Sequence, residues 1–295
     1  MTVREAPLDR RLNAFRPDLA DARLAGRVEA DRFVEGVPHR VTAASAPLRR
    51  SAAVTAPLET ELVAGETVAV FDRDGEGWSF VQSLVDGYVG YAPADALARA
   101  DAVPAATHRV VVPATLVFPE PDIKAPPVGA LSMGAAVPAI AEMAGGGRTF
   151  LRLADHTLVV AAHLRRVDAG PIADWVALAA SLSGTPYLWG GKTRAGIDCS
   201  GLVQLALQTA GHAAPRDSDM QEAVLGAPYA AGPAVPDGLR RGDLLFWPGH
   251  VGTMVDEGRL LHANAHHMLT VVEPLAAVIE RHEAAGVRLR TVRRP

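Results

Sequence analysis

One segment, residues 198–211, restricts the fold of this chain more than any other. It begins with Asp198 and Cys199, and apolar residues then recur at helical spacing as far as Ala210. Aspartate is a good N-cap, and Gly211 suits the left-handed position at the end of a helix. The pattern therefore predicts a helix that begins at Cys199, the only cysteine among the 295 residues.

The place of Cys199 at a helix start has a chemical consequence. The partial positive charge at a helix N-terminus favours the thiolate, and the thiolate is the nucleophilic form of cysteine. A lone cysteine is also often a small buried hydrophobe. The residue by itself leaves both interpretations open.

Composition limits the class of protein. With 49% hydrophobic and 21% charged residues the chain is globular, and a net charge of −4 argues against a nucleic-acid partner or an anionic membrane surface. One cysteine excludes an intrachain disulfide framework. The first residues contain no apolar signal-peptide core, and no apolar run is long enough to span a membrane. We therefore expect a soluble cytoplasmic protein without membrane insertion; its oligomeric state is left open.

Short strand patterns dominate the first half of the chain. Residues 1–38 are predicted to form an N-terminal arm or short helix packed on the next segment of the chain. Residues 39–100 contain short strand patterns separated by Gly and Asp turns, which are typical of a small barrel. The tripeptide His39-Arg40-Val41 recurs as His108-Arg109-Val110, so residues 101–168 are predicted to be a second copy.

Residues 172–295 have a different pattern. Asp174 is expected to cap a short helix over 175–182, which precedes the helix that starts at Cys199. Strands are then predicted near residues 243–247, 250–255, 259–264 and 268–273. Helices succeeded by antiparallel strands indicate an α+β domain.

Two histidines stand on neighbouring predicted strands, His250 and His262. If a two-residue turn at 257–258 closes the hairpin, they face opposite sides of the sheet. If the loop is 256–258 and ends in a left-handed glycine, Gly252 pairs with His262 and both histidines share a face. An ordinary turn can therefore assemble a nucleophile, a base and a third group that orients the base.

Each histidine could also be a hydrogen-bonded core or surface residue, or a zinc ligand. His262 and His266 invite a zinc site, but there is no His-Glu-x-x-His helix and no nearby cysteine to complete it. We therefore expect no metal and no other cofactor. His266 and His267 are expected in solvent, whereas His250 and His262, taken together with Cys199, favour the catalytic interpretation.

Four motifs in a fixed order carry a family resemblance. Pro186-Tyr-Leu-Trp-Gly-Gly, Asp198-Cys-Ser-Gly-Leu-Val, Gly242-Asp-Leu-Leu-Phe and Gly249-His-Val-Gly resemble the NlpC-type family of papain-like cell-wall cysteine peptidases. The two upstream repeats resemble bacterial SH3-like barrels. The implied fold is an α+β papain-like peptidase domain preceded by two small all-β SH3-like barrels.

The resemblance implies a thiol protease that acts on peptidoglycan peptides, a γ-D-glutamyl-L-diamino acid endopeptidase or dipeptidyl-peptidase. Such enzymes cut between D-Glu and diaminopimelate or Lys. The catalytic residues of the family match Cys199, His250 and His262. The Cys199 N–H is the implied oxyanion donor with the Tyr187 hydroxyl as a second candidate, although Tyr187 and Trp189 could equally be core residues. Asp198 and Ser200 flank the nucleophile and are also expected at the site.

The loop Pro215-Arg-Asp-Ser resembles a variant found in relatives that require a free N-terminal L-Ala. Asp217, beside Ser218, would pair with the ammonium group, or would be an ordinary exposed turn residue. Such relatives also reach the amine through an acid and a tyrosine of the first barrel, for which Glu61 and Tyr88 are the best matches. The expected role is turnover or recycling of murein peptides. The alternative is a wall- or protein-binding module with an acyltransferase-like or inactive third domain, and catalytic turnover would distinguish the two.

Overall fold

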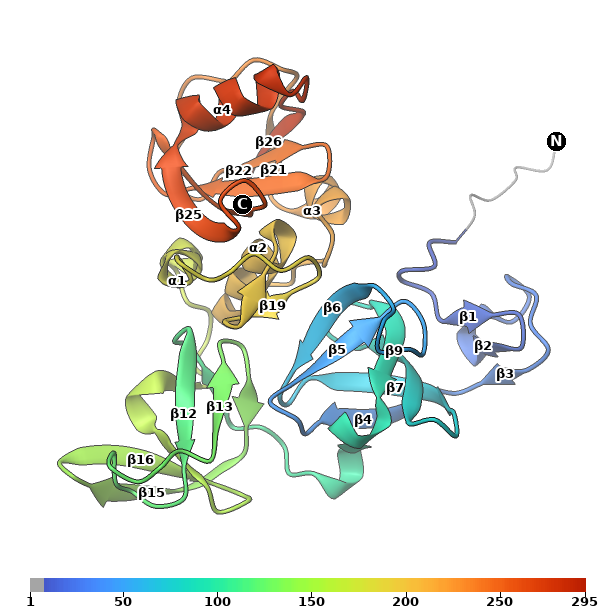
Figure 1. Cartoon of the computed structure of the whole chain (residues 1–295). Coiled ribbons are helices and arrows are strands. Elements are labelled where there is room, and N and C mark those ends of the chain that lie inside the picture. Colours follow the sequence, from blue (N-terminus) through green and yellow to red (C-terminus); the bar gives the residue numbers. More distant parts are fainter. Residues whose placement is uncertain (1–7) are drawn as a thin grey trace. The chain divides into compact units, whose positions relative to one another are not determined.

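The computed structural model describes residues 8–295, which divide into two compact units, residues 8–104 and 105–295 (Figure 1). No helix within residues 8–295 is long and apolar enough to cross a membrane.

The first unit is built around one seven-stranded sheet in the order β10-β4-β7-β8-β9-β5-β6, with every neighbouring pair antiparallel. Short strands and tight turns are what the Gly and Asp spacing predicted. The strands are β4 (Val37–Val41), β5 (Ser45–Arg49), β6 (Leu58–Val63), β7 (Thr67–Arg73), β8 (Trp78–Ser83), β9 (Val89–Pro93) and β10 (Leu97–Arg99).

The segment before this sheet contains strands and no α-helix within residues 8–38, so the helix alternative was wrong. It forms β1 (Phe15–Arg16), β2 (Leu19–Asp21) and β3 (Phe33–Val34), with a 3₁₀ turn at Ala22–Leu24. The Asp21 carboxylate accepts a hydrogen bond from the Arg23 N–H, which favours this tight turn over a longer helix. Ala14 and Leu19 pack against apolar residues of β7 and β8, so this segment is an arm packed on the barrel region as expected.

The second unit begins with two small antiparallel sheets. One has the order β14-β11-β18 and the other β13-β12-β17-β16-β15. Their strands are β11 (His108–Val110), β12 (Ala114–Phe118), β13 (Gly129–Ser132), β14 (Ala136–Val137), β15 (Ala139–Gly145), β16 (Arg148–Leu153), β17 (Leu158–Val160) and β18 (Leu164–Arg166).

The repeated tripeptide occupies equivalent strands. In β4 it pairs antiparallel with Leu97–Arg99 of β10, and in β11 it pairs antiparallel with Leu164–Arg166 of β18. This shared pairing supports the duplication. That residues 101–168 form a second SH3-like barrel stays a prediction.

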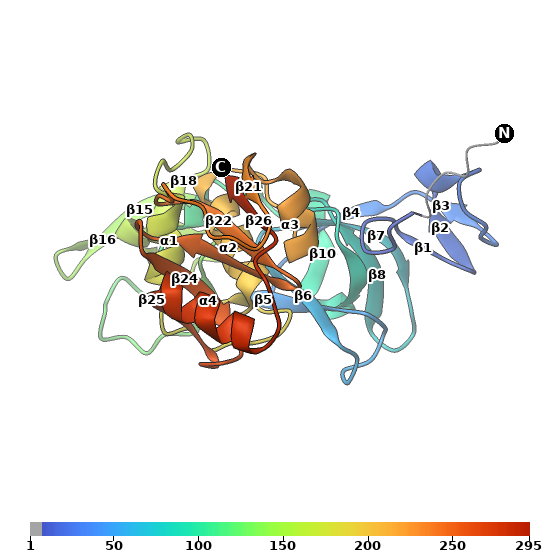
Figure 2. The same cartoon turned by 90° about the horizontal axis from the view of Figure 1, so that it is seen from above.

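The rest of the second unit contains four helices and a six-stranded antiparallel sheet in the order β21-β26-β22-β23-β24-β25 (Figures 1 and 2). The strands are β21 (Ala227–Ala231), β22 (Leu244–Trp247), β23 (His250–Met254), β24 (Arg259–Asn264), β25 (Leu269–Pro274) and β26 (Thr291–Arg294). The helices are α1 (Trp175–Ser181), α2 (Cys199–Ala210), α3 (Ser218–Val224) and α4 (Leu275–Ala284).

Helices α1 and α2 and the four predicted strands are confirmed, whereas α3, α4, β21 and β26 were not predicted. A short hairpin, β19 (Lys192–Thr193) and β20 (Gly196–Ile197), precedes α2.

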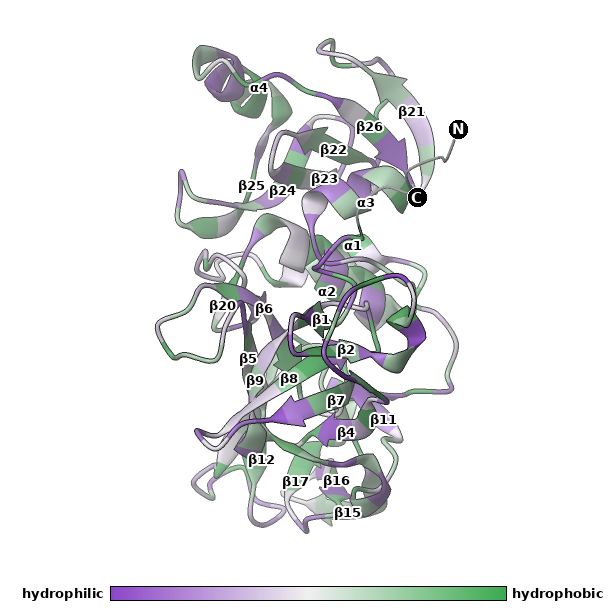
Figure 3. Ribbon diagram, turned by 90° about the vertical axis from the view of Figure 1, so that its right-hand side faces the viewer, coloured by the Kyte–Doolittle hydropathy of each residue, from purple (hydrophilic) through white to green (hydrophobic). Residues whose placement is uncertain are grey.

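The sheet has an apolar core on each face. Because side chains alternate along a strand, Leu244 and Phe246 of β22 pack with α1 and α2, while Leu245 and Trp247 pack with α4. Figure 3 shows α4 carrying both hydrophobic and hydrophilic residues, as expected for a helix with one face on the sheet. The start of α2 is thereby held rigidly against the middle strands.

Candidate active site

The N-terminus of α2 presents the predicted nucleophile. Asp198 has the extended conformation of an N-cap, and its Oδ1 accepts a hydrogen bond from the Gly201 N–H at 2.7 Å. Cys199 is therefore the first helical residue, and its side chain is buried. At the other end Gly211 has a left-handed φ of 96°, so the predicted bounds of this helix are confirmed.

The hairpin that carries the two histidines has the register that places them on one face. Thr253 pairs with Leu261 and Met254 with Leu260, which sets His262 opposite residue 252. The three-residue loop 256–258 is confirmed, but its predicted left-handed glycine is not, because Gly258 has no positive φ. The Asp256 carboxylate instead closes the loop by accepting backbone N–H bonds from residues 258 and 259.

The two imidazoles meet directly. Nε2 of His250 lies 2.8 Å from Nδ1 of His262, and the rings are roughly edge to face with centroids 5.0 Å apart. His262 is fully buried, and its Nε2 lies 2.7 Å from Oε1 of Glu273 on β25. Nδ1 of His250 has no hydrogen-bond partner among the described residues, which leaves that nitrogen available for chemistry.

Cys199 lies beside the strand that begins at His250. The backbone N–H of Val251, the next residue along β23, donates a hydrogen bond to the Cys199 sulfur. Burial, and after it the negative charge of Asp198, nevertheless raises the pKa of Cys199 to about 12. This direction is opposite to the shift expected from the helix start.

The pKa of the neighbouring imidazole is also shifted towards the neutral form. Burial, and after it repulsion from His262 and His282 in their protonated forms, holds the pKa of His250 well below 6.5. Both shifts favour a thiol and a neutral imidazole over an ion pair. An arrangement of this kind can act when the imidazole removes the thiol proton as the sulfur attacks.

Two aromatic rings pack against His250. His282 of α4 stacks on Trp247 with centroids 4.9 Å apart, and on His250 with centroids 5.6 Å apart. The Nδ1 of His282 is 2.9 Å from the backbone carbonyl of Val278, which holds its ring in place. The stack restricts the orientation of the His250 ring.

A buried ion pair supports the start of α2. Arg216 is 1% exposed, and its Nη2 donates to Oδ2 of Asp198 at 2.6 Å while its Nη1 donates to Oγ of Ser200 at 2.8 Å. Asp198 also accepts the Gly190 N–H at 2.8 Å. The side chains of Asp198 and Ser200, expected among the binding residues, are thus buried in a network that holds the loop and the helix together.

The two aromatic candidates differ in exposure. Tyr187 is partly buried and packs against the apolar cluster that contains Cys199, and burial raises the pKa of its hydroxyl. Trp189 is 71% exposed, so the interpretation of this residue as core is wrong. Tyr187 is therefore near the nucleophile, and Trp189 offers an apolar surface in the same loop.

The remaining candidates lie on two different units. Asp217 and Ser218 are half-buried at the start of α3, and the Asp217 side chain makes no capping hydrogen bond. Tyr88 and Glu61 belong to the first unit. Tyr88 is buried and its hydroxyl donates to Glu59 at 3.4 Å, while Glu61 is half-buried on β6. His266 and His267 are exposed, as expected.

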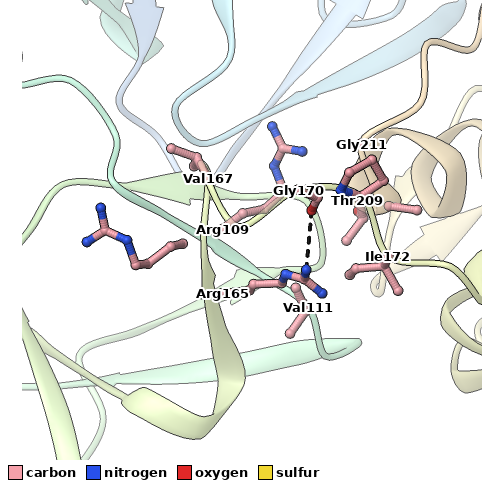
Figure 4. A pocket seen from close by; sticks show the side chains of 11 residues that line it. Arg109, Val111, Arg165, Val167, Gly170, Ile172, Thr209 and Gly211 are labelled. Carbon is pink, nitrogen blue, oxygen red and sulfur yellow. Dashed lines mark hydrogen bonds between the residues drawn. The ribbon is translucent and has the colours of Figure 1, made fainter.

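A cavity of about 190 Å³ lies at the opposite end of α2, roughly 16 Å along the helix from Cys199 at 1.5 Å per residue (Figure 4). Arg109 donates to the Gln208 carbonyl at 2.8 Å there, and Arg165 donates to the Gly170 carbonyl at 3.3 Å. These arginines complement the negative end of the helix. The cavity is therefore separate from the cysteine and histidines.

Sequence reasoning missed Arg216, Asn264, Glu273, Arg281 and His282. The strand pattern of the sequence could have indicated two of them, Asn264 and Glu273. On β24 the side chains of residues 262 and 264 share a face, and on β25 Glu273 occupies the position diagonal to His262. Arg216 and the two residues of α4 are brought to the site by loops and helix packing, which strand alternation does not predict.

We expect acid to destabilise the second unit through its buried histidines. Burial lowers the pKa of His262 to about 4, although the bond to Glu273 opposes this shift. Between pH 6.5 and 4 the unfolded chain therefore binds a proton that the folded chain does not. Lowering the pH through this window should cost about 3 kcal/mol of unfolding free energy.

The measurement is the thermal midpoint of this unit at a series of pH values between 7 and 4. A His262→Asn variant should show a shallower pH dependence, and His212→Asn, at an exposed position, should leave the dependence unchanged. An identical slope in the His262→Asn variant would contradict the assignment of this proton to His262.

Two family models match parts of this chain. Residues 184–288 match the NlpC/P60 family, and residues 48–97 match the bacterial dipeptidyl-peptidase SH3 domain. A γ-D-glutamyl-L-lysine dipeptidyl-peptidase of Bacillus subtilis is 32% identical over 141 residues, which cover 42% of this chain and 45% of that protein. A protein of the same name from Bacillus cereus is 25% identical over 78% of this chain and 74% of its own length.

Dipeptidyl-peptidase 6 of Lysinibacillus sphaericus is 40% identical over 30% of this chain and 31% of that protein. The chain thus spans less than half the length of this protein and of the Bacillus subtilis relative. The crystal structure of an NlpC/P60 family protein from Bacillus cereus shares the fold, with a TM-score of 0.71 and 19% identity over 87% of this chain and 99% of that one. Residues 184–288 are therefore a domain of the NlpC/P60 type, and residues 48–97 before it are an SH3 domain of the bacterial dipeptidyl-peptidase type.

Proposed function

We propose that this chain is a cysteine peptidase that cleaves murein peptides between D-Glu and the adjoining diamino acid, diaminopimelate or Lys. The observation that carries the proposal is the placement of Cys199 at the start of α2, bonded to the backbone directly after His250. The dipeptidyl-peptidases named among its relatives support the choice of a γ-D-glutamyl bond.

The reaction can be written from the protonation states of the site. The Cys199 sulfur attacks the γ-carbonyl of D-Glu while His250 takes the thiol proton through its unoccupied Nδ1. The same proton passes to the departing amine of the diamino acid as the C–N bond breaks, which leaves a thioester. Water then attacks the thioester, gives a proton back to Cys199 through His250, and releases the acid.

Oxyanion stabilisation is assigned to two donors near the sulfur. The Cys199 N–H lies in the first turn of α2, where backbone N–H groups lack helical partners. The Tyr187 hydroxyl is the second donor, and its raised pKa keeps the proton on the oxygen throughout the working pH range. Exposed Trp189 would contact the peptide beside the cleaved bond.

We also propose that the enzyme requires a free N-terminal L-Ala, whose ammonium group pairs with Asp217. Ser218 is proposed to complete this end of the peptide site within the second unit, while the assignment of Tyr88 and Glu61 to the site stays a prediction. The Asp217 carboxylate is half-buried, and its negative charge acts on the buried Arg216 beside it. An N-acetylated peptide would lose the charge-assisted bond from an ammonium group to this carboxylate.

The prediction is that kcat/KM for L-Ala-γ-D-Glu-diaminopimelate exceeds that for its N-acetylated form by about a hundredfold or more. Asp217→Asn should remove most of this preference by slowing cleavage of the free peptide. Asp219→Asn, an exposed acid two residues further on, is the matched control and should keep it.

Product analysis by mass spectrometry identifies the cleaved bond, and parallel assays with Lys in place of diaminopimelate compare the two diamino acids. Equal rates on the free and acetylated peptides in the unmutated protein would refute the requirement for an amine. No turnover of any of these peptides would favour the alternative, a wall- or protein-binding module with an inactive third domain.

A further inference from the structure

We propose that Glu273 is a positioning residue that sets the tautomer of both histidines, so that Nδ1 of His250 is always the proton acceptor. The proposal rests on the proposed function for the role of His250 as the base. It extends the site from two histidines to a relay that ends on a carboxylate of β25.

Glu273 reaches His262 from the neighbouring strand. Its Oε1 lies 2.7 Å from the imidazole Nε2, and its side chain is 13% exposed. His262 itself is fully buried, so water does not compete for this nitrogen. Nε2 of His262 must therefore form its hydrogen bond with a protein group rather than with water.

Arg281 keeps this carboxylate charged. Its Nη2 donates to Oε1 at 2.6 Å and its Nη1 donates to Oε2 at 3.0 Å, which is a bidentate arrangement. Although burial opposes it, the hydrogen bonds from Arg281 and then His262 lower the pKa of Glu273 to about 2. An ionised carboxylate can only accept hydrogen bonds.

The charged Glu273 fixes the hydrogen position on His262, which in turn fixes the hydrogen position on His250. Since Glu273 is an acceptor, Nε2 of His262 must carry the hydrogen. In a neutral imidazole the other nitrogen is then an acceptor, so Nδ1 of His262 receives its bond from Nε2–H of His250. The remaining nitrogen of His250, Nδ1, is left with a lone pair, which is the state required to take the thiol proton.

Asn264 is a second hydrogen-bond partner of the same His262 nitrogen and could set the opposite tautomer. Its Nδ2 lies 2.9 Å from Nε2 of His262, and its Oδ1 accepts the His267 N–H at 2.8 Å, which orients the amide. If this amide donated to Nε2, the lone pair of the imidazole would face the Glu273 carboxylate at 2.7 Å. Two acceptors at that distance repel each other. A charge-assisted bond is also about twice as strong as a neutral one, so the hydrogen stays on Nε2 of His262 and bonds to Glu273.

The reversed tautomer would inactivate the base. With hydrogen on Nδ1 of His262, Nε2 of His250 would have to accept, and its Nδ1 would carry the proton. The ring cannot readily rotate to compensate, because it lies in the stack with His282 and Trp247.

The test begins with the unmutated chain carrying ¹⁵N-labelled histidine. We expect NMR to show Nε2 protonated and Nδ1 unprotonated in both His250 and His262 at pH 7.5. Hydrogen on Nδ1 of His262 would overturn the proposal without any variant. In Glu273→Gln, which is nearly isosteric, a substantial fraction of the reversed tautomer should appear. The same tautomers in that variant as in the parent would also overturn it.

Asn264→Ala separates the two assignments. If Glu273 sets the tautomer, this variant keeps the parent pattern; reversal there would assign the role to Asn264 and refute the proposal. Glu280→Gln removes the same charge from an exposed position of α4 and is the matched control.

Kinetics give a second readout. We expect Glu273→Gln to lower kcat by about 10–100-fold with little change in KM, as replacement of a supporting group behind a functional histidine does elsewhere. An unchanged kcat would count against the relay. Alkylation of Cys199 by iodoacetamide as a function of pH should slow in the same variant, and requires no substrate.

Failure of the proposed function would look different. A parent chain that cleaves none of the murein peptides, yet shows the expected tautomers and their dependence on Glu273, would refute the peptidase assignment and leave the relay. Full peptidase activity in Glu273→Gln, with unchanged tautomers, would refute the relay alone.

Discussion

Replacing Cys199 by alanine, or His250 by alanine, is expected to abolish peptide turnover while the fold remains intact. Without the sulfur no thioester forms, and without the imidazole nothing removes a proton from a thiol whose pKa is about 12. Loss of a nucleophile or its base commonly reduces kcat by about 10⁴-fold or more. The measurement is product formation from L-Ala-γ-D-Glu-diaminopimelate, monitored by mass spectrometry over several hours.

Circular dichroism and thermal midpoints check that both variants are folded. His212→Ala removes an imidazole from an exposed position and should keep the parental rate. Persistent activity in the cysteine variant would end the thiol mechanism. Inhibition by chelators but not by alkylating reagents would instead point to a metal-dependent reaction.

Replacing Arg216 by methionine is expected to destabilise the second unit by about 3–5 kcal/mol. The guanidinium is 1% exposed and carries the ion pair and hydrogen bonds that hold Asp198 and Ser200. Methionine fills similar space but leaves the Asp198 carboxylate buried without its cation. Thermal or urea unfolding of the second unit measures the loss, and peptidase activity should fall because Asp198 caps the helix that presents Cys199.

A double variant tests the cause of that loss. Asp198→Asn in the Arg216→Met background removes the unpaired charge and keeps a good N-cap, so it should recover part of the stability. Arg288→Met, at an exposed position in the loop after α4, should change stability by less than about 0.5 kcal/mol. Equal stability of Arg216→Met and the parent would show that the pair contributes nothing to the fold.

The neutral state favoured at this site gives a common reason for the supporting residues. A thiol and an imidazole without charge attract each other only weakly, so their relative position depends on the groups that surround them. Asp198 and Arg216 hold the helix start that carries the thiol, while Glu273 bonds to His262 and His282 stacks on His250. In the proposed mechanism the geometry therefore depends on packing around the reacting atoms as much as on the atoms themselves.

Much of the site was predictable from local pattern alone. Asp198 and Gly211 marked the two ends of α2, because capping is decided by residues adjacent in sequence. The period of two showed that a three-residue loop at 256–258 would place His250 and His262 on one face, whereas a two-residue turn would not. The sequence left both loops open, and the register in the structure selects the first.

Other features depended on contacts between segments distant in sequence. The arm before residue 39 forms strands rather than a helix, since its apolar residues pack on β7 and β8. The pKa of Cys199 is shifted in the direction opposite to the expected one, because the helix dipole is visible in the sequence whereas the burial is not. Desolvation depends on every element packed around a group, so only the tertiary structure decides it.

Contacts between segments distant in sequence also explain why several residues around the site were not predicted. Arg216 lies in the short loop between α2 and α3, and nothing in its sequence neighbours indicates that it is buried against Asp198. Glu273, Arg281 and His282 reach the histidines only because β25 and α4 fold back over β24. The sequence alone pointed to the groups proposed to react and to the elements that carry them; the tertiary structure decided the favoured charge of these groups and which residues hold them, because both depend on burial and on contacts made across the fold.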